Sequence, residues 1–248
     1  MFIYTDLTCD LRGIFENTQR KSAVRIQTPS PGNSEALFHK YKPTKFTALY
    51  ISLKLVTYIH SIIRNQMPSS QLIIDQTITW IRKVVIGCNF CPFAARALQQ
   101  QHVHYQVEAS TNTALCLDAF LKEIVRLDEE LHIETGLLIF SNAFQQFDEY
   151  LYMLSLAESL LKEKGYEGVY QLASFHPLYR FASSAKNDAA DYTNRSIYPM
   201  LHLLRESSID KALAHYENPE KIPERNVDFA RKKGSTFMKL LRDSCLNS

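Results

Sequence analysis

The sequence predicts an α/β fold: a small, mostly parallel sheet of about three or four strands flanked by helices, with a helical C-terminal part. Three short segments, residues 102–108, 135–140 and 168–175, have the apolar patterns of strands. Segments with a helical period lie between them, and the connections are short. Strands that alternate with helices in this order are typical of a parallel sheet.

The first two helices are predicted on either side of a polar turn. Apolar residues of 72–85 recur at intervals of three or four, the period of an amphipathic helix, and Gly87 ends this helix. A short helix is expected after Cys91, because Pro92 lacks an N–H and suits a first helical position. Cys91 is then the N-cap residue. The inward positions of the first helix are Ile74, Ile78, Ile81 and Val85.

Two longer helices are predicted between the strands. Thr111, Asn112 and Thr113 cap the first, while the second spans about 144–164 and ends at Gly165. Their inward positions are Leu117, Phe120, Leu121, Ile124 and Val125 in the first helix, and Phe147, Leu151, Leu154 and Leu161 in the second.

Another helix is predicted to begin at Pro199, again because proline suits the first helical position. Tyr198, His202 and Arg205 then fall on one polar stripe of that helix. Residues 224–226 (Glu-Arg-Asn) stand behind a proline and open the last helix. The neighbouring stripe, which can face the protein interior, contains Leu201, Leu204 and Ser208.

Charge and cysteine content limit the classes of function. The chain carries a net charge of +2, but residues 1–70 hold nine basic and four acidic side chains, which leaves the remainder at −3. A slightly acidic domain argues against a nucleic-acid-binding surface, which needs clustered Lys and Arg. The odd count of five cysteines and the absence of a signal peptide favour a reducing compartment, so a cytoplasmic location is expected.

The first seventy residues differ in character from the rest. Residues 27–34 are turn-rich, and the apolar run 46–63 is interrupted by Lys54 and His60 and is short for a bilayer span. No membrane association is therefore expected, and a span over 46–63 is the less favoured alternative. We predict that residues 1–70 are a poorly ordered extension or reflect a mis-assigned start, with translation beginning at Met67. Residues 71–234 then form a single domain, and 235–248 a C-terminal tail.

Polar side chains concentrate after the third predicted strand. A non-repetitive stretch of this length is typically functional or disordered, and its aromatic content speaks against disorder. His176 follows the strand directly, at the edge of the sheet where α/β proteins bind ligands. The alternative interpretation is a solvated helix face, with His176 as a structural histidine. The predicted ligand-binding residues are Tyr179, Tyr192, Asn194, Arg195, Tyr198, Arg205, Glu206, Arg225 and Asn226.

Cys91 is a candidate nucleophile, because a thiol at a helix N-terminus has a lowered pKa. The alternative is a small buried hydrophobic residue. Cys88 completes a C-x-x-C motif, but the preceding segment is helical in period, which argues against a thioredoxin-like redox site. No second cysteine or histidine pair completes a zinc site, and we expect His102 and His104 to be surface residues. Glycine-rich nucleotide-binding loops and the common hydrolase motifs are missing.

Four segments together resemble a bacterial family classified as domain of unknown function 1415. They are Gly87–Ala94, Ala173–Tyr179, Tyr192–Glu206 and Glu224–Asn226. The likeness covers about residues 71–234. The pattern of this family includes the cysteine before Pro92 but not Cys88, which makes redox chemistry through the pair doubtful. The resemblance implies that the motif residues converge in one site; it implies no reaction.

Three hypotheses for the function follow. The first is an enzyme acting on a small anionic or polar metabolite, with Arg195 and Arg205 binding the anion and His176 or His202 as general acid or base. Cys91 would be the nucleophile in a covalent version. The second is a non-catalytic module that binds a ligand or a partner. The third is a divalent-metal site using His176, His202 and Cys91. The sequence does not specify the substrate, the cofactor or the oligomeric state.

Overall fold

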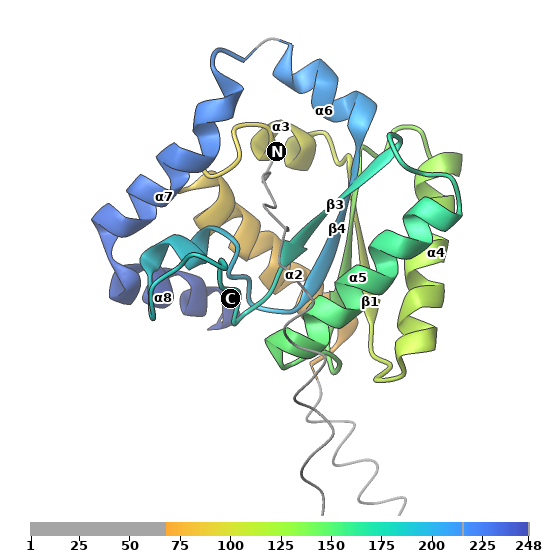
Figure 1. The fold of residues 1–248 in the computed structure, drawn as a ribbon, viewed down its shortest axis with the longest axis horizontal. Coiled ribbons are helices and arrows are strands. Elements are labelled where there is room, and N and C mark those ends of the chain that lie inside the picture. Colours follow the sequence, from red (N-terminus) through yellow and green to blue (C-terminus); the bar gives the residue numbers. More distant parts are fainter. Residues whose placement is uncertain (1–67, 215, 248) are drawn as a thin grey trace, which may run out of the picture. The chain divides into compact units, whose positions relative to one another are not determined.

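The computed structural model describes residues 68–214 and 216–247. A four-stranded sheet forms the centre of this part of the chain, with helices on both faces (Figure 1). The predictions for residues 1–67, including the apolar run 46–63 and the start at Met67, lie outside the described residues. The strands are β1 (Val103–Glu108), β2 (Thr135–Phe140), β3 (Tyr170–Phe175) and β4 (Met200–Arg205). The α-helices are α2 (Ser70–Trp80), α3 (Ala94–Gln99), α4 (Thr113–Glu129), α5 (Phe147–Glu163), α6 (Glu206–Leu213), α7 (Ile222–Lys233) and α8 (Ser235–Asp243).

Shorter helical segments link these elements. The π-helix η2 (Ile81–Ile86) continues α2 without a break and ends at Gly87 as predicted. A side chain at Gly87 would collide with the carbonyl of Lys83, so this close turn requires glycine. The 3₁₀ segments are η3 (Ala189–Thr193), η4 (Pro219–Lys221) and η5 (Ser244–Asn247).

The sheet is mixed, and the prediction of a mostly parallel sheet is wrong. The strand order is β1-β2-β4-β3, in which β1 pairs with β2 in parallel. β4 lies between β2 and β3 and pairs with both in antiparallel register. The α/β class and the number of strands are as predicted, and the three predicted strands occupy their expected positions.

β4 is the element that the sequence analysis assigned to a helix. Four of the five residues 200–204 are apolar, and the exception is His202. For an apolar run this short, the periodicity of the sequence does not distinguish a buried strand from a buried helix. As a strand, β4 directs alternate side chains to opposite faces of the sheet. The side chains of His202 and Arg205 therefore leave β4 on opposite sides and do not share a stripe, although Arg205, at the end of the strand, lines one cavity together with His202.

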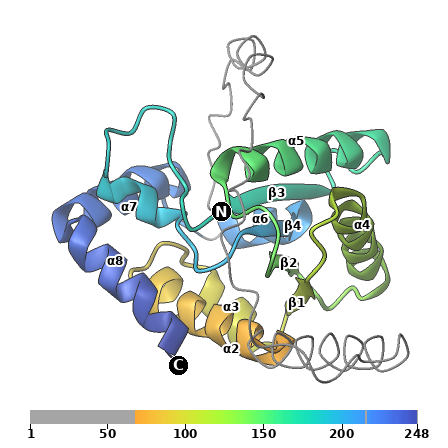
Figure 2. The same cartoon turned by 90° about the horizontal axis from the view of Figure 1, so that it is seen from below.

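Helices cover both faces of the sheet (Figure 2), and an apolar core lies on each face. The first, which we call the α5 face, packs α4 and α5 against the sheet through Phe120, Tyr150, Leu138, Leu201 and Leu203. The second, the α2 face, packs α2, η2, α7 and α8 through Trp80, Val84, Leu137, Ile139, Phe175, Met200, Ala230 and Met238.

Helix positions were predicted better than their buried faces. In the first helix the buried side chains include Ile73, Thr77 and Trp80, whereas Ile74 and Ile78 are half-buried. Apolar residues occur on several sides of this helix, so their periodicity does not predict which side is buried. In α4, Val125 is exposed although it was predicted to face inward. Gly165 ends α5 with a φ of 78°, as the C′ position requires.

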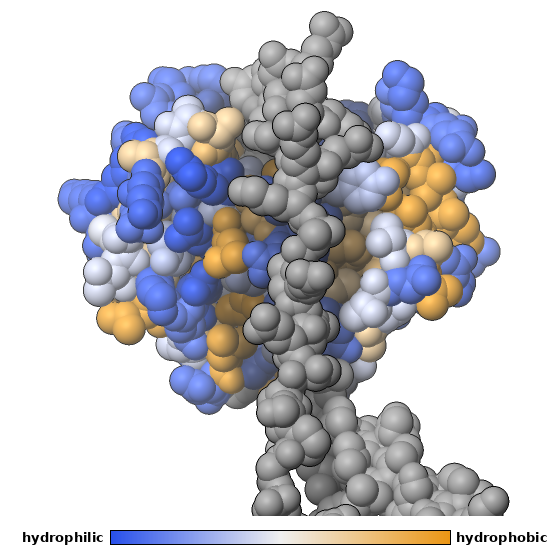
Figure 3. Space-filling view, turned by 60° about the horizontal axis from the view of Figure 1, so that its bottom comes forward, coloured by the Kyte–Doolittle hydropathy of each residue, from blue (hydrophilic) through white to orange (hydrophobic). Residues whose placement is uncertain are grey.

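Residues 235–247, which the sequence analysis treated as a tail, form α8 and η5. Met238 and Cys245 are fully buried there, within the core of the α2 face. None of the helices described is long and apolar enough to cross a membrane. The exposed large apolar side chains include Leu115 and Val125 on α4. Figure 3 shows apolar surface on the side where α4 and α5 lie.

Candidate ligand cavity on the α2 face

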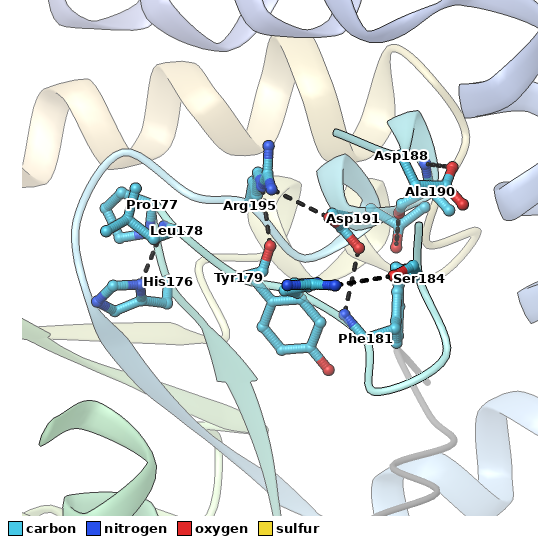
Figure 4. Close-up of polar contacts among 12 residues, drawn as sticks. His176, Pro177, Leu178, Tyr179, Phe181, Ser184, Asp188, Ala190, Asp191 and Arg195 are labelled. Atoms are coloured by element: carbon cyan, nitrogen blue, oxygen red, sulfur yellow. Dashed lines mark hydrogen bonds and ion pairs between the residues drawn. The ribbon is translucent and has the colours of Figure 1, made fainter. Parts of the chain in front are cut away.

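His176 is fully buried and both of its ring nitrogens are engaged. Nε2 donates a hydrogen bond to the Phe144 carbonyl at 2.8 Å, and Nδ1 accepts one from the Leu178 amide at 2.9 Å (Figure 4). The ring packs against Phe147 and Tyr150 of α5. Burial lowers the pKa of His176, which keeps the imidazole neutral. His176 is thus a satisfied structural histidine on the α5 face.

Arg195 and Asp191 form the centre of the loop between β3 and β4. A terminal guanidinium nitrogen of Arg195 lies 3.0 Å from Asp191 Oδ2, and Nε donates to the Tyr179 carbonyl at 2.8 Å (Figure 4). The other carboxylate oxygen, Oδ1, accepts from the Phe181 amide at 3.2 Å. Asp191 is fully buried. We call residues 176–195 the polar knot, because these interactions bind the loop to itself.

The remaining predicted residues of this segment are also committed to internal contacts. Asn194 Nδ2 donates to the Ser174 carbonyl at 3.2 Å. The Tyr192 ring lies beneath the guanidinium of Arg195, 4.7 Å from its centre. The Tyr198 hydroxyl donates to Gln76 Oε1 at 2.5 Å and so ties the end of the loop to α2.

Arg205 holds the C-terminal end of α4. Its terminal nitrogens donate to the carbonyls of Leu127 and Ile133 and to the Tyr170 hydroxyl. A cation at the last carbonyls of a helix complements the helix dipole. Arg205 and Arg195 each bind protein groups in different regions, so the structure does not bring them together as the predicted anion-binding pair.

Glu206 begins α6 and lines an open hollow of about 750 Å³ beside the edge strand β3. Glu158, Glu167 and Asp210 line the same hollow, with Lys162. The hollow is dominated by carboxylates, which makes it unsuited to the anionic metabolite of the first hypothesis.

Arg225 and Asn226 clamp the turn that precedes Cys91. Arg225 donates to the Asn89 carbonyl at 2.5 Å, and Asn226 Nδ2 donates to the Phe90 carbonyl at 2.7 Å. Asn89 has a φ of 56°, the left-handed conformation that asparagine tolerates. Both residues of α7 therefore fix the backbone that carries Cys91.

Cys91 is not an N-cap residue. α3 begins at Ala94 and its N-cap is Phe93, because Pro92 and Phe93 form a turn ahead of the helix. Cys91 is 8% exposed, and neither Cys91 nor Cys88 takes part in a disulfide within the described residues. Burial raises the pKa of Cys88, which argues against an easily oxidised pair.

Cys91 and His202 line one cavity of about 110 Å³ on the α2 face. The sheet forms one wall, and α2, η2, α3 and α6 supply the others. Its lining is mainly apolar, with few polar side chains among the aromatic and aliphatic ones, as in small-molecule sites. The lining includes Trp80, Val85, Phe93, Ala97, Leu98, Leu137, Phe175, Leu204 and Ile209, together with Glu134, Thr135 and Arg205.

His202 has one engaged nitrogen and one without a partner. The Thr135 hydroxyl donates to the Leu203 carbonyl at 2.5 Å, so its single proton is used. His202 Nε2, 2.6 Å from the same hydroxyl, must therefore be the donor in that contact. Nδ1 then carries a lone pair, is buried, and has no hydrogen-bond partner among the described residues. Burial lowers the pKa of His202 to about 3, so the ring is neutral at physiological pH.

Trp80 supplies a second buried polar atom without a partner among the described residues, its indole Nε1–H. The ring meets Phe175 edge to face, with centroids 5.1 Å apart, and Phe175 also contacts the His202 ring at 5.7 Å. Sequence analysis missed Trp80. One feature of the sequence could have drawn attention to it: Trp80 is the only tryptophan of the chain, and it lies within a predicted amphipathic helix, two turns before Gly87.

The structure does not support the predicted metal site. His176 packs on the α5 face and His202 on the α2 face, so they cannot share an ion. Within the described ranges, no group of three or more His, Cys, Asp or Glu is arranged to hold a metal. His102 and His104, expected at the surface, are partly buried and contact Glu134 and Glu123 at 3.0 and 2.6 Å.

Residues 72–240 match the family described as protein of unknown function, DUF1415. The chain belongs to this family. The match includes Trp80, Cys91, the polar knot, His202 and the α7 clamp, and it extends into α8. No curated protein and no solved structure matches the chain.

Proposed function

We propose that this member of the DUF1415 family binds a small molecule in the cavity between the α2 face of the sheet and helices α2, α3 and α6. The observation that carries the proposal is that two buried polar atoms of the cavity lining, Trp80 Nε1 and His202 Nδ1, have no partner among the described residues. A third such atom is Nε of Arg205, whose terminal nitrogens are already held by protein groups. The proposal rests on the atoms of Trp80 and His202. Buried polar groups are nearly always paired, and leaving one unpaired costs about 1–3 kcal/mol. A ligand that pairs with both atoms would recover this free energy.

The comparison with the polar knot supports this location. The predicted ligand-binding side chains of the knot bind one another or the backbone, so a ligand there would have to displace existing interactions. The cavity offers apolar surface and unpaired polar atoms at the same place, which is the usual composition of small-molecule sites.

A cavity-filling substitution tests the proposal. Ala97 lines the cavity from α3, and Ala97→Leu should occupy part of its volume while leaving the fold intact. The same change at exposed Ala114, near the start of α4, is the matched control. We expect small neutral compounds to raise the Tm of the parent and of Ala114→Leu but not of Ala97→Leu. Equal shifts in all three proteins, or none in the parent, would contradict the proposal.

Catalysis through Cys91 is the second candidate, favoured by the presence of Cys91 and His202 in one cavity. In an acyl transfer, His202 Nδ1 would take the thiol proton as sulfur attacks a carbonyl carbon, and the departing alkoxide would then take that proton. Water would later hydrolyse the thioester. The low pKa of His202 makes it a weak base, so catalysis ranks below binding.

Reaction with an activated acetate ester distinguishes the two. Catalysis predicts one acetyl group on Cys91 by intact mass and peptide mapping, retained in Cys88→Ala and lost in Cys91→Ala. Labelling at the same low rate in the parent and in His202→Gln would leave simple binding as the function.

A further inference from the structure

Of the three unpartnered atoms in the cavity lining, Trp80 Nε1 and His202 Nδ1 have opposite hydrogen-bonding character. The indole Nε1–H of Trp80 only donates. His202 Nδ1 only accepts, because the Thr135 contact places the ring proton on Nε2. Trp80 is 1% exposed and His202 is 9% exposed, so bulk water does not satisfy either atom. A ligand group that fits both must accept one hydrogen bond and donate another.

The charges around the cavity disfavour an ionised ligand. The carboxylate of Glu134 is part of the lining, and a carboxylate or phosphate ligand would meet both this charge and the lone pair of His202. Arg205 also lines the cavity, and its Nε has no partner, but its terminal nitrogens are held by Leu127, Ile133 and Tyr170. An ammonium group has no acceptor to offer Trp80 and loses hydration in an apolar enclosure.

The size of the cavity limits the rest of the ligand. A cavity of roughly 150 Å³ holds a benzene molecule, so about 110 Å³ suits a slightly smaller one. The walls of the cavity are mainly aliphatic and aromatic, and Val85, Leu98 and Phe175 are among the residues that form them. Such walls favour a short hydrocarbon chain or a small ring.

We infer that the ligand is a small uncharged hydroxyl compound, whose hydroxyl oxygen accepts from Trp80 Nε1 while its proton is donated to His202 Nδ1. The short hydrocarbon portion packs against the apolar wall. This inference rests on the proposed function and adds the chemical class of the ligand. A hydroxyl is the smallest group other than water that offers both a donor and an acceptor.

Four probes of similar length test the class. Butan-1-ol donates and accepts, its isomer methyl propyl ether only accepts, butanoate is an anion, and butylammonium is a cation. Trp80 is the only tryptophan of the chain, so its emission reports on the cavity in the full-length protein. We expect butan-1-ol to change the emission in a saturable manner and to bind about tenfold more tightly than the ether, since one buried polar atom stays unpaired with the ether. Ala97→Leu should abolish the saturable change.

Two variants separate the hydrogen bonds from the volume of the cavity. His202→Gln places its amide near the position of Nε2, so it can keep the contact with Thr135, but it removes the Nδ1 acceptor. In this variant the alcohol should lose its tenfold preference over the ether. Trp80→Phe, followed by Tm shift instead of emission, should weaken the binding of both compounds but keep the preference, because only the alcohol can donate to His202 Nδ1.

The outcomes distinguish the inference from the proposed function. Equal binding of alcohol and ether, abolished by Ala97→Leu, would overturn the hydroxyl class and leave the cavity as a binding site. Tightest binding of butanoate or butylammonium would overturn it too. If none of the probes binds, both the class and the proposed function fail, and a bound water satisfies the two atoms.

Discussion

The polar knot and the cavity on the α2 face contain similar residue types but differ in how their polar atoms are used. In the knot, Arg195, Asp191 and His176 have their polar groups paired within the protein. In the cavity, Trp80 and His202 each bury a polar atom without a partner among the described residues. The sequence segment with many polar residues therefore forms a loop that is folded on itself. The candidate site is instead indicated by two residues, Trp80 and His202, that lie far apart in the sequence.

The physical lesson is that the availability of polar groups, and not their density, indicates a binding site. A loop of about twenty residues cannot be buried unless its polar groups pair with one another. The knot meets this requirement with guanidinium, carboxylate and imidazole groups. A binding site must instead leave interactions open for the ligand, and this costs stability in the free protein.

The largest expected effect is in the knot. Arg195→Ala leaves the fully buried carboxylate of Asp191 without its cation, and we expect a loss of about 3 kcal/mol in unfolding free energy. For a domain of this size, this lowers the Tm by roughly 6–12 °C. Arg231→Ala is the matched control, because the pair of Arg231 with Asp188 is more exposed and should contribute less than about 1 kcal/mol. Similar small losses in both variants would contradict a structural role for the knot.

The next effect is a loss of stability in acid. The pKa of His202 is about 3 in the folded protein and about 6.5 when unfolded. The unfolded state therefore binds an extra proton below about pH 6.5, and stability falls by up to about 1.4 kcal/mol per pH unit as the pH decreases towards 3. His176, whose pKa is also lowered by burial, adds to this slope.

Urea unfolding at a series of pH values measures this dependence. His202→Gln has no ionisable side chain at this position, so its slope between about pH 6.5 and pH 5 should be smaller by one proton. An unchanged slope would mean that His202 titrates normally in the folded protein and is not the buried neutral acceptor described above.

The smallest expected effect concerns the clamp on the Cys91 turn. Asn226→Ala removes the hydrogen bond to the Phe90 carbonyl, worth about 1–2 kcal/mol when buried. Opening of the turn should increase, and the rate of Cys91 alkylation should rise about 5–30-fold. Asn142→Ala, which removes an exposed bond of the same chemical type to the Ala109 carbonyl elsewhere, should leave the rate unchanged. Equal rates in both variants would show that Asn226 does not position Cys91.

Much of the fold followed from sequence patterns. The strands β1, β2 and β3 and the helices α4 and α5 are bounded by alternation, caps and glycine, which are local signals. β4 was missed because its apolar run is compatible with either a strand or a helix, and its insertion between β2 and β3 is decided by pairing with distant residues. The mostly parallel sheet was predicted without β4, and the two antiparallel pairings of β4 make that prediction wrong.

The candidate site followed from sequence only in part. Cys91, His202 and Arg205, three predicted site residues, line the same cavity, although the terminal nitrogens of Arg205 are held by protein groups. His176 and Arg195 form structural contacts elsewhere. Local sequence does not reveal whether a polar group finds a partner, because the partners of the predicted site residues lie up to 136 positions away along the chain. For the same reason, the sequence around Trp80 does not indicate that its indole N–H is unpaired.

The most direct test of the contrast between the two regions follows His176 and His202 together by long-range ¹H–¹⁵N NMR of the imidazole rings during titration with butan-1-ol. Both rings should be neutral with the proton on Nε2. Addition of the alcohol should shift the Nδ1 signal of His202, which gains a hydrogen bond, and leave that of His176 unchanged. A shift of His176 with His202 unaffected, or a doubly protonated His202 at neutral pH, would contradict the account.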